Sequence, residues 1–230
     1  MSAAAWTRDE FEARMRAVPE RRYHHLHSFN LRMHAGELSK DELRGWILNR
    51  FHYQRHIPIK DALTLAKLET PELRRSWIRR IHDHDGTRPG EGGIERWLRL
   101  GEAAGLPREQ LLSGQDVLPA VRLAVEGYVN LCRLGTPLEA VAASLTELFA
   151  PDLMRRRIDA FERHYPWIDQ DGLTYFRMRV PQGARDGEEA LELVLSWATG
   201  RADQERAVAA LAYKCDVLWS LLDAVERAYR

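Results

Sequence analysis

The sequence predicts an all-α fold, a compact bundle of helices that forms a single domain over residues 1–230. Helix start and stop signals recur throughout the 230 residues, and the apolar residues between them repeat every three or four positions. Alternating Val, Ile and Thr patterns, which are typical of strands, are absent. No low-complexity linker or internal repeat divides the chain, so we expect one domain.

Capping boxes mark several of the predicted helix starts. The segments "TRDE" (7–10), "SKDE" (39–42) and "TPLE" (136–139) each have Thr or Ser followed three residues later by Glu. Pro71 suits a first helical position, and Gly86 suits the residue just beyond a helix end. We therefore expect helices at 7–18, 20–36, 40–57, 59–68, 71–85, 93–105, 117–134, 137–149, 152–165, 172–180, 185–199 and 203–229.

Proline and glycine should interrupt this pattern at defined places. Pro58 should break or kink the chain between helices 40–57 and 59–68, because proline lacks a backbone N–H and its ring crowds the preceding turn. The segments "GTRPGEGG" (86–93) and "VPQGARDG" (180–187) are rich in Gly and Pro, so we expect flexible loops there.

The composition gives no reason to expect a nucleic acid or membrane partner. Lys+Arg and Asp+Glu both number 34, so the formal net charge is zero. No apolar run approaches the length that spans a membrane, and the first residues lack the pattern of a signal peptide. Cys132 and Cys215 fall in apolar helical patterns, as buried thiols do in a reducing compartment. We therefore expect a cytoplasmic protein.

Positively charged residues lie within the predicted apolar faces of several helices. In helix 71–85, Arg80 and His84 fall on the face that Trp77 and Ile81 define. In other helices the same pattern places cations inward at Arg50, Lys60, Arg157, Arg179 and Lys214.

One such cation would be explained by a side chain whose stem packs against the core while its head reaches water. Several from different helices indicate a shared cavity, and burying unpaired cations costs several kcal/mol each. An anionic ligand would compensate this cost. The alternative is a set of internal ion pairs, for which Glu147 and Asp61 are candidates.

The inward residue types suit an organic polyanion. Arginine holds carboxylates through two parallel hydrogen bonds. His84 can exchange protons near neutral pH. Hydrogen bonds to oxygen atoms that gain charge can come from Tyr23, Tyr53, Tyr128 and Tyr175.

Metal and cofactor motifs are weak or absent in the sequence. No His has Glu or Asp three residues before it, as di-iron helical bundles require. His52 and His56 are four residues apart, but the sequence offers no clear third ligand. There is no Gly-rich phosphate loop, no Gly-x-Ser-x-Gly and no Cys-x-x-Cys. We therefore expect neither a metal nor an intrinsic redox cofactor.

Long segments of the chain resemble the pyrroloquinoline-quinone synthase family. The resemblance runs from about residue 20 to the C-terminal helix. It rests on "NRFHYQRHIPIKDA" (49–62), "RRSWIRRIHDHDG" (74–86), "GIERWLRLGEAAGL" (93–106), "SLTELFAP" (144–151) and "HYPWI" (164–168).

This resemblance implies a compact helical fold of the heme-oxygenase-like, thiaminase-II-like type and a homodimer. It implies an enzyme that closes the second ring of a bicyclic tricarboxylate precursor and oxidises it with dioxygen. The quinone PQQ is then the product, hydrogen peroxide is released, and no metal or organic cofactor takes part.

Site residues carry over from the resemblance one by one. The catalytic and oxygen-side positions of the family match His84, Tyr175 and Arg179. The substrate-binding positions match Tyr23, His24, Arg50, Tyr53, Gln54, Lys60, Arg80, Tyr128, Glu147, Arg157 and Lys214. In the family, the segment that carries Tyr175 and Arg179 closes over bound ligand, and Gly172 and Pro181 predict a short helix suited to a lid.

The chain departs from the family pattern at Met154, where the family has an active-site histidine. Methionine cannot transfer a proton, so one proton-relay contact is missing. This leaves open a homologue that binds the quinone without efficient turnover. A thiaminase-II-like hydrolase on the same fold is another alternative, and it would need a reactive thiol at Cys132 or Cys215. A metal-dependent oxygenase is a third.

Overall fold

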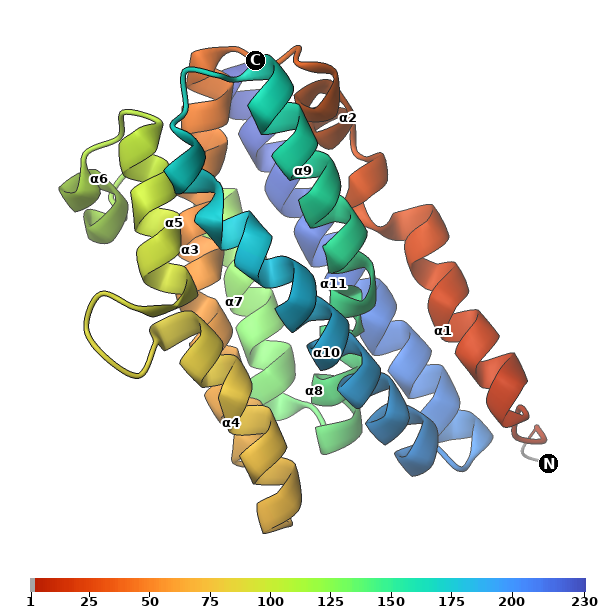
Figure 1. Ribbon diagram of the computed structural model, residues 1–230. Coiled ribbons are helices and arrows are strands. Elements are labelled where there is room, and N and C mark those ends of the chain that lie inside the picture. The colour runs from red at the N-terminus through yellow and green to blue at the C-terminus, as the bar shows by residue number, and fades with distance from the viewer. Residues whose placement is uncertain (1–2) are drawn as a thin grey trace.

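The computed structural model describes residues 3–230, and these form helices joined by short loops, with no strand among them (Figure 1). The prediction of an all-α fold is confirmed. The elements are α1 (Arg8–Arg22), η1 (His24–Leu26), α2 (Ser28–Ala35), α3 (Lys40–Leu65), α4 (Pro71–Asp85), α5 (Gly92–Ala103), α6 (Arg108–Ser113), α7 (Pro119–Leu134), α8 (Pro137–Ala143), η2 (Ser144–Phe149), α9 (Ala150–His164), η3 (Gln170–Leu173), α10 (Thr174–Trp197) and α11 (Arg201–Tyr229), where η marks 3-10 helices.

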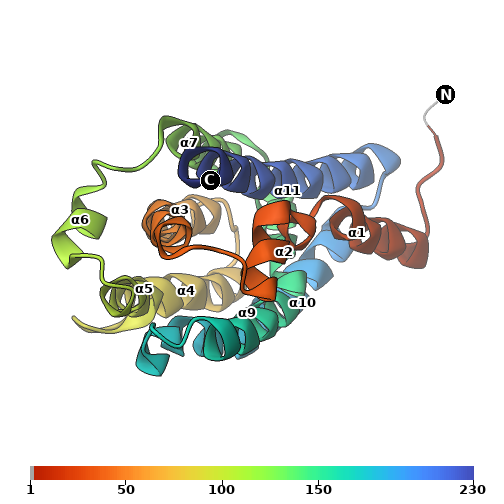
Figure 2. The same cartoon turned by 90° about the horizontal axis from the view of Figure 1, so that it is seen from above.

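Helix α3 lies at the centre of the bundle. Seen from above, it sits between the side formed by α7 and α11 and the side formed by α4 and α5 (Figure 2). Helix α10 packs along α9 and over η2, while α1 packs on the outer side of α11. Because α3 touches helices on several sides, polar groups along it can face a chamber that helices from other parts of the sequence complete.

The capping predictions are confirmed. Thr7, Ser39 and Thr136 each accept a hydrogen bond from the backbone N–H three residues later, and the glutamate at that position caps in return. Pro71 occupies the first turn of α4, and Gly86 ends that helix with φ of 80°. Local side-chain chemistry therefore sets these helix ends as the sequence indicated.

The helix breaks predicted at the two prolines are wrong, while the alternative of a kink at Pro58 stays a prediction. Pro58 lies inside the continuous helix α3, and Pro181 lies inside α10, so the predicted loop at 180–187 and the short helix 172–180 do not exist. An internal proline costs about 3 kcal/mol in an isolated helix. In both helices, buried residues on either side of the proline pack into the core, and this packing offsets the local cost.

Three further differences concern short elements. The residues of the predicted helix 20–36 instead form the end of α1, which continues through Pro19, followed by η1 and α2. The predicted helix 137–149 tightens into 3-10 geometry at Ser144. Helix α6 was not predicted, since its six residues are too few to show an apolar period.

Helix α10 lies directly against η2 because glycine faces it. A Cβ atom on Gly187 would fall 2.7 Å from the backbone nitrogen of Leu148, which no side chain could accommodate. A Cβ on Gly183 would lie 3.4 Å from Oε2 of Glu147. This close approach brings the inner face of α10 to the acidic residue of η2. None of the helices within residues 3–230 combines the length and apolarity that crossing a bilayer requires.

Candidate active site

A small cavity lies inside the bundle, between η1, α3, η2, α9, α10 and α11, and it offers about 30 Å³ to water-sized molecules. Nine residues named from the sequence line it: Tyr23, His24, Arg50, Tyr53, Gln54, Glu147, Met154, Tyr175 and Arg179. Ile57, Thr146, Ala150 and Leu218 complete the lining. Residues from distant parts of the sequence therefore meet at one place.

The remaining named residues lie in a layer behind this lining. They are Lys60, Arg80, His84, Tyr128, Arg157 and Lys214, and all are buried. Lys214 Nζ donates a hydrogen bond of 2.6 Å to Tyr53 Oη, and the rings of Tyr53 and Tyr128 stack 6.3 Å apart. The layer is thus joined to the cavity through side chains that line it.

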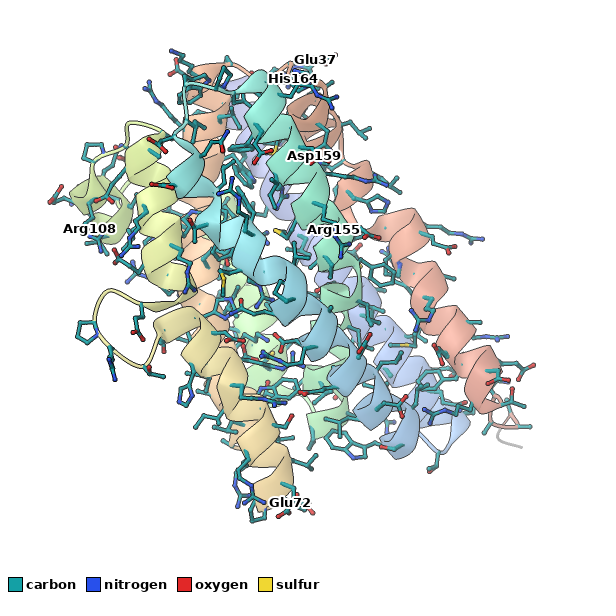
Figure 3. The ribbon with its side chains drawn as sticks, in the orientation of Figure 1. Glu37, Glu72, Arg108, Arg155, Asp159 and His164 are labelled. Carbon is teal, nitrogen blue, oxygen red and sulfur yellow. The ribbon has the colours of Figure 1, made fainter. Side chains whose placement is uncertain are left out.

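The helical faces were predicted correctly. On α9, Arg155 and Asp159 point away from the bundle (Figure 3), whereas Arg157 is 1% exposed and lies over the ring of Trp46. All six inward cations are buried: Arg50, Lys60, Arg80, Arg157, Arg179 and Lys214.

Some of these cations have carboxylate partners, as the ion-pair alternative supposed. Lys60 Nζ lies 2.6 Å from Asp61 Oδ1, and Arg179 Nη2 lies 2.5 Å from Glu147 Oε2. Arg179 Nη1 also lies 3.6 Å from Oδ2 of Asp186, whose backbone carbonyl accepts a hydrogen bond from Arg80. Three carboxylates therefore face six cations.

The other four cations, Arg50, Arg80, Arg157 and Lys214, have no ion-pair partner within residues 3–230, and Arg80 has only the backbone carbonyl of Asp186. Arg157 Nη2 donates to the amide oxygen of Asn30 at 3.1 Å, and Arg50 stacks 4.0 Å above the centre of the Tyr53 ring. Lys214 has the phenol of Tyr53. The Nε atoms of Arg50, Arg80 and Arg157 are buried with no hydrogen-bond partner in the described chain.

The local field reflects this excess of positive charge. Burial and the guanidinium of Arg50 lower the pKa of Arg157 to about 9. Burial, Arg50 and Lys60 also hold the pKa of Lys214 well below its ordinary value. A bound anion would relieve both effects, because an opposite charge favours the protonated form.

His84 is a neutral base in this setting. Burial and the charge of Arg179 lower its pKa to about 3. Its Nδ1 lies 3.0 Å from the backbone carbonyl of Arg80, which can only accept, so Nδ1 carries the proton. Nε2 is buried without a partner among the described residues and presents its lone pair.

Tyr175 lies beside His84 and belongs to the same corner of the site. A Cβ on Gly93 would lie 3.3 Å from the Tyr175 ring and 3.5 Å from the His84 ring, so this glycine fits between them. Tyr175 Oη donates a 2.8 Å hydrogen bond to the side-chain oxygen of Gln54. Burial raises the pKa of Tyr175, so its phenol stays protonated and can donate.

Sequence reasoning missed Asp186, a carboxylate that is 2% exposed on α10. Burial alone would raise its pKa, but the charges of Arg80, Arg179 and Arg185 together outweigh burial, and the pKa lies below its ordinary value. The signal was present in the spacing, because Asp186 is seven residues after Arg179, two helical turns along one face. Because a loop was predicted at 180–187, Arg179 and Asp186 were not recognised as lying on one helical face.

The other reactive groups considered from the sequence lie away from the cavity lining. Cys132 and Cys215 are buried, and burial raises the pKa of Cys215 to about 12. Burial also raises the pKa of Cys132. The rings of His52 and His56 contact each other, and no third potential ligand joins them within residues 3–230. A reactive thiolate at this site is therefore disfavoured.

Comparison with known proteins gives relatives of nearly full length. The chain is 50% identical over 223 residues to the pyrroloquinoline-quinone synthase of Cronobacter sakazakii, covering 97% of this chain and 88% of that protein. It is 51% identical over 231 residues to that of Pseudomonas aeruginosa, covering 100% and 91%. With that of Granulibacter bethesdensis the identity is 48% over 223 residues.

Solved structures with low sequence identity share the fold. A TenA homologue from Pseudomonas syringae superposes with a TM-score of 0.76 at 14% identity, covering 95% of this chain and 92% of that one. A domain with a heme oxygenase-like fold from Shewanella denitrificans gives 0.74 at 16% identity, covering 96% and 90%. The predicted heme-oxygenase-like fold is confirmed.

The resemblance found in the sequence motifs is also confirmed, since the family model described as TENA/THI-4/PQQC matches residues 12–224. That match includes all or most of each element from α1 to α11 and every residue that lines the cavity. The chain belongs to the TENA/THI-4/PQQC family.

Proposed function

We propose that this protein is a pyrroloquinoline-quinone synthase, an oxidase that acts without a metal or organic cofactor. It closes the second ring of a bicyclic tricarboxylate precursor and oxidises it with dioxygen to the quinone. The observation that carries the proposal is the excess of buried cations: six face three carboxylates, and a ligand with three carboxylates balances them. The relatives that bear this name and are about 50% identical support it.

Four of the six cations have no ion-pair partner among the described residues, and we assign three of them to the carboxylates of the ligand. The fourth, Arg80, already donates to the backbone carbonyl of Asp186. Arg50, Arg157 and Lys214 come from α3, α9 and α11, so together they can fix the orientation of a rigid tricarboxylate. Holding the precursor in a folded conformation brings its reacting atoms together and supplies the proximity that ring closure needs.

The cavity of about 30 Å³ is much smaller than the several hundred Å³ typical of sites for ligands of this size. Binding therefore involves outward movement of the surrounding helices. Helix α10 is the candidate, because it carries Tyr175 and Arg179 and lies at the surface of the bundle (Figure 1). As a continuous helix of 24 residues, it would move as one body.

In the proposed mechanism, His84 removes carbon-bound protons through Nε2, and the positive surroundings stabilise the electron-rich product. Each two-electron oxidation then passes two electrons and two protons to dioxygen and releases one hydrogen peroxide. Arg179 and Tyr175 would stabilise the negative charge that develops on oxygen as it is reduced. The ligand itself supplies the electrons.

Two further parts of the proposal come from the resemblance and the composition. We propose a homodimer and a cytoplasmic location. The main alternative within the family is a homologue that binds the quinone without oxidising its precursor. Met154 favours this alternative, since it lines the same cavity as Tyr175 and Arg179 and cannot relay a proton.

The test is to mix the protein with the reduced bicyclic precursor without oxygen and then admit air. The proposal predicts quinone absorbance, oxygen uptake and hydrogen peroxide in fixed ratio, with loss of rate in His84→Ala. Tight quinone binding with no oxygen uptake would identify the binding homologue. Wild-type rates in His84→Ala would refute the assigned base.

A further inference from the structure

Asp186 contacts three arginines from one buried position. Its Oδ2 lies 3.6 Å from Arg179 Nη1, and its Oδ1 accepts a 2.7 Å hydrogen bond from Arg185 Nη2. Its backbone carbonyl accepts from Arg80. Arg179 is thereby held between two carboxylates, Asp186 on its own helix and Glu147 on η2.

The network continues from α10 to α4. Arg185 Nη2 also lies 2.5 Å from Asp83 Oδ2, and Asp83 directly precedes His84 in α4. The chain Arg179, Asp186, Arg185, Asp83 alternates in charge, so each member offsets the desolvation of its neighbours. It joins the helix that carries the proposed oxygen-side arginine to the helix that carries the proposed base.

We propose that Asp186 is a positioning residue for the oxidation, which aligns Arg179 with His84 by linking α10 to α4 through Arg185 and Asp83. This inference rests on the proposed function. Asp186 need not touch the ligand, and its negative charge works against binding a tricarboxylate. Asp186 therefore increases the rate of oxidation and does not increase the affinity for the quinone.

A second ion pair between the same helices offers a matched control. Arg79 and Glu189 pair with each other, and Glu189 also accepts a hydrogen bond from Ser76 Oγ at 2.7 Å. This pair is partly exposed and contacts none of the proposed site residues. Glu189→Gln removes a charge from the α4–α10 contact without reaching Arg179.

The experiment compares Asp186→Asn with Glu189→Gln. Asp186→Asn keeps the size of the side chain and removes its charge. Its kcat for oxidation should fall about 10- to 100-fold, as misalignment of catalytic groups typically causes. Its Kd for the quinone should stay equal or become lower, because the positive excess of the site grows by one. Glu189→Gln should change both values less than about two-fold.

General loosening of the fold would weaken binding and rate together, so equal losses of both in Asp186→Asn would overturn the proposal. A kcat within two-fold of the wild type would overturn it as well. If Asp186→Asn does not fold, Asp83→Asn at the other end of the network takes its place. It should lower kcat by a smaller factor, again without weakening quinone binding. An unchanged kcat in Asp83→Asn would also overturn the proposal.

Amide hydrogen exchange gives a readout that does not depend on turnover. In the protein without ligand, residues 174–187 should exchange several-fold faster in Asp186→Asn than in the wild type or Glu189→Gln, and unchanged exchange would overturn the proposal. If the wild type itself fails to oxidise the precursor, the proposed function fails, while exchange and quinone affinity still decide whether Asp186 positions α10.

Discussion

Arg179 Nη2 lies 2.5 Å from Glu147 Oε2, so the arginine assigned to the oxygen-side chemistry already has a carboxylate partner within the protein. Arg50, which lines the same cavity, has no ion-pair partner in residues 3–230. The charge of Arg179 is therefore paired inside the protein, whereas that of Arg50 remains available to a ligand. A neutralised arginine contributes less to holding an anionic ligand than an unpaired one.

This difference predicts opposite effects of two substitutions. Arg179→Ala should slow the oxygen-dependent steps about 100-fold or more, while quinone affinity falls only a few-fold. Arg50→Ala should weaken quinone binding about 30-fold or more, as loss of a buried charge pair does. Single-turnover oxidation and equilibrium titration of both variants measure these effects, and thermal melts verify that each is folded. Equal losses of rate and affinity in Arg179→Ala would count against its oxygen-side role.

The neutral His84 predicts how stability depends on pH. Its pKa in the folded protein is about 3, below the value near 6.5 of an unfolded chain. Below pH 6.5 the unfolded chain binds a proton that the folded protein does not, so stability falls as pH decreases from 6.5 toward 3. One such group contributes about 1.4 kcal/mol per pH unit.

Urea unfolding at pH 7.5, 6.0 and 5.0 measures this dependence. His84→Gln should reduce the slope by about that amount. The exposed His82, two residues earlier on α4, provides a control for exchanging histidine for glutamine on this helix. The same slope in His84→Gln and wild type would mean that His84 protonates in the folded state.

Removing a buried cation should raise the stability of the ligand-free protein where the cation has no carboxylate partner and lower it where the cation has one. Lys214→Met removes a cation that has no carboxylate partner in the described chain, so the ligand-free protein should become more stable by about 1 kcal/mol or more, while quinone affinity falls at least about 30-fold. Lys60→Met leaves Asp61 buried without its partner at 2.6 Å and should cost about 3–5 kcal/mol.

Chemical denaturation without ligand and quinone titration test both variants. A destabilised Lys214→Met would show that hydrogen bonding to Tyr53 outweighs the cost of burying that charge.

Met154 predicts a gain of rate rather than a loss. It lines the cavity with Tyr175 and Arg179, and histidine at this place would supply a group that exchanges protons. Met154→His should raise the rate of oxidation about 10-fold or more without changing quinone affinity more than a few-fold. Met154→Leu keeps an apolar side chain and should leave the rate near that of the wild type. Similar rates in Met154→His and wild type would show that another group already transfers the proton.

The composition of the site could be read from the sequence because the helical period is a local property. The spacing of apolar residues on 71–85 placed Arg80 and His84 inward, and the same spacing placed Arg157 inward on the helix that carries it; all three are buried. The inward residue types indicated an organic polyanion, and the resemblance in the motifs then indicated which one. The pairing of charges could not be read in this way, since Glu147 and Asp61 were candidates for ion pairs without assigned partners.

The tertiary structure decided which charges are neutralised and how long the helices are. Asp186 reaches Arg179 only because α10 runs through Pro181, and the helix continues there because its two halves pack against α9 and η2. The sequence by itself determined which faces of the helices are apolar and which cations those faces carry, because a side chain's direction follows from its place in the helical turn. Partners and proline tolerance depend on the helix that lies opposite, and that is set when the whole chain packs.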